Sequence, residues 1–164
     1  MLTSGSIDMF AAMCTKSRER EQVIDFSITY FSTGQKILVK KGSGIKSYRD
    51  LAGKTVTAVQ GSSNIESFKK VQPGGKILAF QEYPQCVLAV KQGKAAALTS
   101  DATMLYEFAK QDPDLEVVGA AFTREPYGIG VRENDSKWLK FINHSILELW
   151  DSGEFNQIHK KIFG

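Results

Sequence analysis

Cysteine, excess charge and long hydrophobic runs are all scarce in this sequence of 164 residues. The two cysteines, Cys14 and Cys86, are too few for a disulfide framework, so side-chain packing must hold the fold together. No apolar run approaches the roughly eighteen residues that a membrane-spanning helix needs, and the residues after Met1 lack the basic-then-apolar pattern of a signal peptide. We therefore expect no membrane span, while export of the protein stays open.

Basic residues exceed acidic ones only slightly, because 21 Lys and Arg face 18 Asp and Glu. A net charge of +3 is too small to indicate a nucleic-acid or membrane surface, and we expect no nucleic-acid partner. Five basic residues are spread across a turn and a short helix, and we interpret them as a solvated face. They are Lys40, Lys41, Lys46, Arg49 and Lys54.

The common catalytic and metal-binding motifs are also absent. The sequence contains no G-x-S-x-G, H-E-x-x-H or C-x-x-C, and we expect no metal and no cofactor. Residues 53–55 (GKT) match the end of a phosphate-binding loop, but the required first glycine would fall at Tyr48 and the segment precedes a strand. The two histidines, His144 and His159, lie on expected terminal helices. A Cys–His nucleophile pair stays open in principle, although His144 fits a helix surface.

Short apolar runs alternate with helical segments along the chain. Strands are expected at 7–13, 23–26, 35–41, 55–59, 76–80, 95–100 and 115–118. Residues 62–64 (SSN) and Asp101 offer N-caps for the helices that follow them, and another helix is expected at 83–92. This order predicts an α/β fold with a largely parallel sheet.

Two loops of this pattern are candidate ligand sites. In parallel sheets, ligands bind beyond the carboxyl ends of the strands, near helix N-termini. The loop at 60–64 and the pair Ser100-Asp101 both have this position. A strand at 127–131 and two amphipathic helices separated by Gly153 come next. They do not extend the central pattern, and they indicate a second lobe built from both chain ends.

Several segments together resemble the polar amino-acid-binding proteins of bacterial ABC importers (solute-binding protein family 3). The residues at 2–8 (LTSGSID) resemble the family's L-x-x-G-x-x-D, and those at 19–27 match its signature E-R-x-x-x-x-D-F-S. The residues at 50–56 match D-L-x-G-K-x-V, and VQGSS at 59–63 begins a helix. EPYGIGV at 125–131 is similar to the family's return hinge. The similarity runs from end to end.

The resemblance implies a type II periplasmic-binding fold, with two lobes of mainly parallel sheet and flanking helices. One lobe would be formed by 1–35 and 124–164, and the other by 36–123. Such a protein captures a free amino acid between its lobes and presents the closed form to an ABC permease, without catalysis, in the periplasm or outside the cell. A ligand-sensing domain of a receptor or sensor kinase is one alternative. A dehydratase on the same fold is another, although residues 102–104 (ATM) offer it no acid.

The resemblance also assigns binding roles to individual residues. A zwitterionic amino acid needs a cation for its carboxylate and an anion for its ammonium, which Arg20 and Asp101 would supply. Thr15 matches a hydroxyl beside the ligand, Met13 a backbone carbonyl, and Ser63 a backbone N–H at a helix N-terminus. With the adjoining loop residues, the candidate ligand-binding residues are Arg20, Asp101, Ser63, Thr15, Met13, Ser62 and Gly61.

The residues alone leave simpler interpretations open for the same positions. Arg20 is also one charge in the mixed run at 18–21, and Asp101, Ser62 and Ser63 are also ordinary N-caps. Met13 stands where the family commonly has a small residue, which would crowd the cleft.

The family begins with a strand and a helix that complete the first lobe, and this chain starts after them. The apolar faces of that lobe should then be partly exposed. We expect self-association into a homo-oligomer, with exchange of elements between protomers as one route. We also expect weak or no amino-acid binding, because one wall of the cleft would be missing.

Overall fold

The computed structural model describes residues 1–163, which form two compact units. Unit 1 combines Met1–Ser32 with Pro126–Gly164, and unit 2 is Thr33–Glu125. The chain passes between the units along β3 (Phe31–Thr33) and β9 (Glu125–Tyr127), which form a two-stranded sheet. No helix within residues 1–163 combines the length and the apolar character that a membrane crossing requires.

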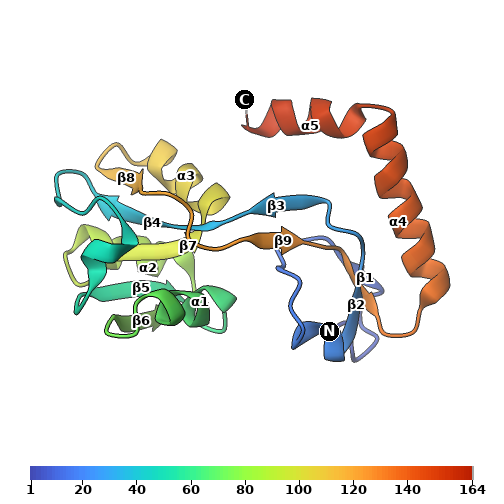
Figure 1. Cartoon of the computed structure of the whole chain (residues 1–164), viewed down its shortest axis with the longest axis horizontal. Coiled ribbons are helices and arrows are strands. Elements are labelled where there is room, and N and C mark those ends of the chain that lie inside the picture. The colour runs from blue at the N-terminus through green and yellow to red at the C-terminus, as the bar shows by residue number, and fades with distance from the viewer. Residues whose placement is uncertain (164) are drawn as a thin grey trace. The chain divides into compact units, whose positions relative to one another are not determined.

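Unit 2 is built on a five-stranded sheet with the order β6-β5-β7-β4-β8 (Figure 1). Its strands are β4 (Gln35–Lys40), β5 (Thr55–Val59), β6 (Lys76–Phe80), β7 (Ala97–Asp101) and β8 (Leu115–Val118). β5 pairs in parallel with β6 and β7, whereas β4 is antiparallel to β7 and β8. The expectation of a largely parallel sheet is therefore wrong for β4. The segment between β4 and β5 contains the 3-10 turn η2 (Tyr48–Leu51) and no crossover helix. A parallel connection needs such a crossover, so β4 runs antiparallel to the direction of β5.

Helices cover both faces of this sheet, as the alternating apolar residues of its strands require. On one face, Leu38 and Leu98 pack with Cys86 of α2 (Tyr83–Lys91) and Leu105 of α3 (Ala102–Gln111). On the other face, Ile37 and Val56 pack with Phe68 of α1 (Ser63–Val71). Cys86 is fully buried in this core.

Unit 1 contains a small sheet with the order β1-β10-β2, in which both pairs are antiparallel. The strands are β1 (Met9–Phe10), β2 (Ile24–Phe26) and β10 (Gly130–Arg132), and the 3-10 turn η1 (Arg20–Gln22) precedes β2. The helix α4 (Ser136–Asp151) packs Ile142 and Ile146 against Val131. The last helix, α5 (Glu154–Phe163), begins after Gly153, whose φ of 76° lets the chain turn between the two helices.

Two expected strands of unit 1 are shorter in the structure. The run at 7–13 forms only the two-residue strand β1, and the run at 127–131 is divided between β9 and β10. The division falls at Ile129, whose carbonyl accepts from the backbone N–H of Ser27 (2.9 Å) and whose N–H donates to Ser27 Oγ (2.9 Å). One of these two bonds uses the Ser27 side chain in place of a backbone carbonyl. The regular backbone pairing of a strand is therefore interrupted at Ile129, and β10 begins at the next residue.

Candidate functional site

Unit 1 contains Arg20, Thr15 and Met13 in the segment that leads to β2. The Arg20 guanidinium donates through Nη1 to the Thr15 carbonyl (2.7 Å) and to Cys14 Sγ (3.4 Å). Burial raises the pKa of the Cys14 thiol, and the positive charge of Arg20 opposes that rise. Both contacts use Nη1, and the planar fork has further N–H groups with which to hold a carboxylate.

Thr15 is fixed by its own backbone, because it forms an antiparallel bridge with Tyr127. The structure therefore brings Thr15 and Arg20 together, and the ligand contacts that the family resemblance implies for both residues stay a prediction. Met13, two residues earlier, has a side chain that is 48% exposed. The arrangement holds a cation on a short, hydrogen-bonded loop, which suits recognition of an anionic group.

Unit 2 contains Gly61, Ser62, Ser63 and Asp101. Gly61 has a φ of 74° between the end of β5 and the start of α1, a conformation that glycine adopts without strain. Asp101 is the last residue of β7 and directly precedes α3. It is buried, with only 8% of its surface exposed. Because β5 and β7 are parallel neighbours, their carboxyl ends lie at the same end of the sheet. The structure thus brings the Gly61–Ser63 loop and Asp101 to one end of unit 2.

Ser62 and Asp101 occupy the N-cap positions of α1 and α3, as the sequence predicts, but neither side chain forms a capping bond within residues 1–163. Ser62 Oγ donates to the Val59 carbonyl (2.7 Å), and within residues 1–163 it accepts no bond from the first turn of α1. The Asp101 side chain likewise accepts no capping bond from α3 in the described chain. Both residues hold the N-cap position without using their side chains to cap. In α3 the first backbone N–H, that of Ala102, donates to the Gly34 carbonyl (2.9 Å), so the helix start that remains a candidate anion site is that of α1, at Ser63.

A buried network behind this end of the sheet was missed by sequence reasoning. Gln35 Nε2 donates to the Asn64 carbonyl (2.8 Å) and to Thr99 Oγ1 (2.7 Å). Asn64 Nδ2 donates to Ser100 Oγ (3.4 Å), which in turn shares a hydrogen bond with the Tyr83 hydroxyl (2.8 Å). Burial raises the pKa of Tyr83, which keeps this hydroxyl protonated. The network links β4, α1, β7 and α2.

Gln35 is the residue on which the network depends. Its side chain is fully buried, and it joins α1 to β7 directly behind Ser63 and Asp101. Its backbone N–H donates to Thr123 Oγ1 (2.9 Å), whose hydroxyl donates to Glu125 Oε1 (2.6 Å) near the end of unit 2. The only signal in the sequence is a glutamine at the start of an apolar strand, and that signal does not identify its partners.

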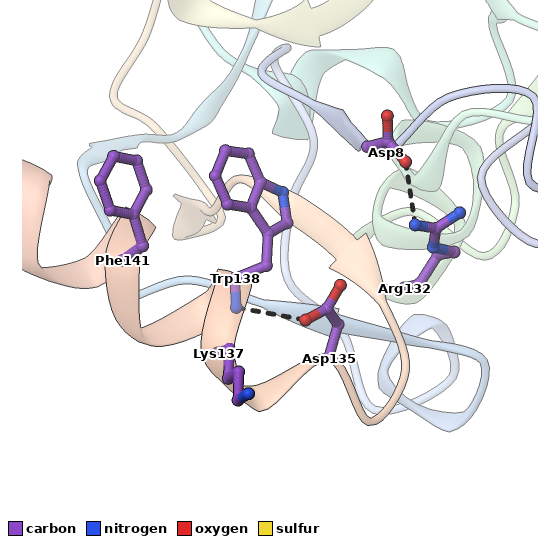
Figure 2. A pocket seen from close by; sticks show the side chains of 6 residues that line it. All are labelled: Asp8, Arg132, Asp135, Lys137, Trp138 and Phe141. Carbon is purple, nitrogen blue, oxygen red and sulfur yellow. Dashed lines mark hydrogen bonds and ion pairs between the residues drawn. The ribbon is translucent and has the colours of Figure 1, made fainter.

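Unit 1 also has an open pocket of about 570 Å³, lined by Asp8, Arg132, Asp135, Lys137, Trp138 and Phe141. Figure 2 shows Trp138 beside Phe141, and their rings stack with centroids 5.2 Å apart and planes 6° apart. Asp8 and Arg132 form an ion pair (2.9 Å), and the Asp135 carboxylate caps α4 at the N–H of Trp138 (3.2 Å). None of the sequence-predicted ligand residues lines this pocket.

The groups that a nucleophilic or metal site would need do not cluster. Cys86 is buried in the core of unit 2, and Cys14 lies beside Arg20. His144 is exposed on α4, 3.3 Å from Glu148, which confirms its predicted surface position. Within residues 1–163, no three His, Cys, Asp or Glu side chains are placed to hold a metal ion.

The whole chain, residues 1–164, matches the family described as bacterial extracellular solute-binding proteins, family 3. It is 40% identical over 162 residues to the ABC transporter glutamine-binding protein GlnH of Bacillus subtilis (strain 168), covering 98% of this chain and 59% of the relative. The chain thus spans less than two thirds of the length of that relative.

Solved structures show the same fold. An ancestral arginine-binding protein bound to glutamine superposes with a TM-score of 0.92 at 38% identity, over 99% of this chain and 74% of that one. An ancestral amino-acid-binding protein described as a precursor of cyclohexadienyl dehydratase has a TM-score of 0.89 at 29% identity, over 99% of this chain and 71% of that one. The expected type II periplasmic-binding fold is confirmed, and this chain belongs to family 3 of the bacterial extracellular solute-binding proteins.

Proposed function

We propose that this chain is the amino-acid-binding component of an ABC importer and works in the periplasm or outside the cell. Units 1 and 2 would act as the two lobes that close over one amino acid and then present the closed form to a membrane permease. Its family and the glutamine-binding relative support this proposal.

One observation carries the proposal: each unit holds one of the two charges that a zwitterion requires. In unit 1, the Thr15 carbonyl fixes the Arg20 guanidinium, which would bind the ligand carboxylate together with Thr15 and the backbone at Met13. In unit 2, Asp101 is buried and would accept from the ligand ammonium. The Gly61–Ser63 loop would add backbone N–H donors at the start of α1.

The test is thermal unfolding with and without each of the twenty amino acids at 1–10 mM. A ligand present at about a hundred times its dissociation constant adds roughly 2.7 kcal/mol, which is an easily measured shift. Although the sequence predicts weak or no binding, the charges of Arg20 and Asp101 favour a selective shift, and we expect this shift to disappear in Arg20→Ala and in Asp101→Asn. Arg18→Ala is the matched control, because Arg18 is exposed and lies only two residues from Arg20. Equal loss in Arg18→Ala, or no shift with any amino acid, would contradict the proposal.

We further propose that the chain is not an enzyme. The dehydratase precursor among the similar structures makes catalysis the alternative to test. The first turn of α3 contains no acidic residue that could donate a proton to a ligand beside Asp101. Incubation with a prephenate- or arogenate-type substrate should leave it unchanged, and release of a dehydrated product would overturn this part of the proposal.

We also propose that the chain forms a homo-oligomer through unit 1. Unit 1 exposes many large apolar side chains within the described residues: Met9, Met13, Val23, Phe141, Leu147, Trp150, Ile158 and Ile162. Surfaces of this kind promote association, and exchange of elements between protomers is one route to it. A dilution series followed by light scattering should show the mass fall with concentration, and a monomer at every concentration would refute this.

A further inference from the structure

Four lysines line one end of the unit 2 sheet. Lys76 begins β6, Lys54 immediately precedes β5, Lys94 precedes β7, and Lys40 ends β4. Because β4 runs opposite to the other three strands, all four positions fall at the same end. The strands are consecutive in the sheet and neighbouring strands lie about 4.8 Å apart, so the row extends over roughly 15 Å. We call this row the lysine end.

The lysine end lies opposite the end that holds Ser63 and Asp101. The crossover helices run back from that far end, so their last turns return toward the lysine end and carry Lys70 of α1 and Lys110 of α3. A depression of about 470 Å³ lies within the row, lined in part by Lys40, Lys54 and Lys94. The sequence pattern indicates that Lys40 and Lys54 are part of a solvated face. It does not group Lys76 and Lys94 with them, because these two lysines are distant in the sequence.

The four side chains of the lysine end have no acidic partner in the described part of the chain. All four side chains are exposed, and within residues 1–163 none of them forms an ion pair or a side-chain hydrogen bond. The nearest acids by topology, Asp112 and Asp114, precede β8 at the edge of the sheet, and Asp112 is already bound by Lys91. Neighbouring strands are about 4.8 Å apart, which is less than one Debye length of roughly 10 Å in 0.1 M salt, so the fields of lysines on adjacent strand ends add.

We propose that the lysine end binds a bilayer surface that presents anionic phospholipid headgroups. Unit 2 carries thirteen Lys and Arg against nine Asp and Glu, and the gathering of four of these lysines at one end, not the net charge, supports the proposal. Within residues 1–163, no aromatic residue and no arginine lines the depression, and lysine is depleted in packed protein interfaces, which disfavours a protein partner. Flexible ammonium groups on an exposed row suit a diffuse layer of phosphates. Docking in this way would leave Ser63 and Asp101 uncovered.

The experiment is co-sedimentation of the full chain with vesicles of phosphatidylcholine alone or with 30% phosphatidylglycerol, at 20 and 150 mM salt. The variant replaces Lys40, Lys54, Lys76 and Lys94 with Gln. The matched control replaces four exposed lysines of unit 1, Lys137, Lys140, Lys160 and Lys161, with Gln and so removes the same charge. Thermal unfolding of both variants verifies that they fold. Soluble polyglutamate serves as a competitor that represents an acidic protein.

We expect binding only to the vesicles with phosphatidylglycerol, and weaker binding at 150 mM salt. Each lysine near an anionic surface strengthens partitioning by about fivefold, so loss of all four should weaken it at least tenfold. The control variant should stay within about twofold of the unchanged protein. No binding to anionic vesicles, an equal loss in the control, or tighter binding to polyglutamate than to vesicles would each overturn the proposal. The result is independent of amino-acid binding.

Discussion

Replacement of Gln35 by Met should loosen the end of unit 2 that holds Asp101. Methionine has a similar length but cannot donate to the Asn64 carbonyl or to Thr99 Oγ1. Each lost hydrogen bond costs about 1 kcal/mol net, so the two together cost about 2 kcal/mol. The substitution also removes Gln35 Oε1, a buried acceptor that has no partner within residues 1–163, and this returns up to about 1 kcal/mol. We therefore expect unit 2 to lose about 1–2 kcal/mol of unfolding free energy.

Amide hydrogen exchange is the assay that resolves this effect. Protection should fall in α1, β4 and β7 of unit 2, while β10 and α4 of unit 1 keep theirs. Tryptophan fluorescence would miss the change, because both tryptophans, Trp138 and Trp150, lie in α4. Gln81→Met is the matched control, since Gln81 is exposed and its amide donates to the Gln60 side chain at the surface, a bond whose loss should cost less than about 0.5 kcal/mol.

Two outcomes would refute this reasoning. A loss below about 0.5 kcal/mol for Gln35→Met would mean that its two bonds contribute no net stability. An equal loss of protection in unit 1 would mean that the effect is not local to the network. If the proposed amino-acid binding holds, Gln35→Met should also weaken the ligand affinity, because α1 and β7 carry Ser63 and Asp101.

Further predictions concern both units. Gly130→Ala should destabilise unit 1 by about 1–3 kcal/mol in a denaturation followed by tryptophan fluorescence, because the new methyl group overlaps the Phe10 ring. Phe10→Leu in the same background should recover part of the loss, and no recovery would exclude this contact as the cause. The hydrogen bond from Lys91 lowers the pKa of Asp112 below its ordinary 3.8, so this stabilisation is present above pH 3.8 and lost as the pH falls further. Urea unfolding of Asp112→Asn should therefore show a weaker decline below pH 4, and an unchanged decline would contradict the assignment.

Local patterns in the sequence predicted the elements of unit 2 well. The residues at 55–59, 76–80 and 115–118 form strands with those bounds, because β-branched and apolar runs end at glycine, proline and aspartate turns. The helix expected at 83–92 is α2. These elements depend on short-range signals, which a sequence carries explicitly.

Features that depend on distant residues could not be predicted in this way. The direction of β4 follows from pairing with β7, some sixty residues later, and no periodicity in QKILVK encodes that direction. The partners of Gln35 come from α1 and β7, and the lysine end collects residues that lie in or before four different strands. The resemblance to a known family, not the residue pattern, singled out Arg20 among the charges at 18–21.

The position of β10 between β1 and β2 constrains the order in which the chain can fold. β1 and β2 lie within the first 26 residues, yet their common neighbour begins at Gly130. On the ribosome, the N-terminal strands must wait unpaired with β10 until all of unit 2 has been synthesised, whereas unit 2 is continuous and can fold first. Non-local pairing of this kind is slow to form. Folding of unit 1 should therefore lag behind that of unit 2, and its apolar strands are the segments that a chaperone would have to shield.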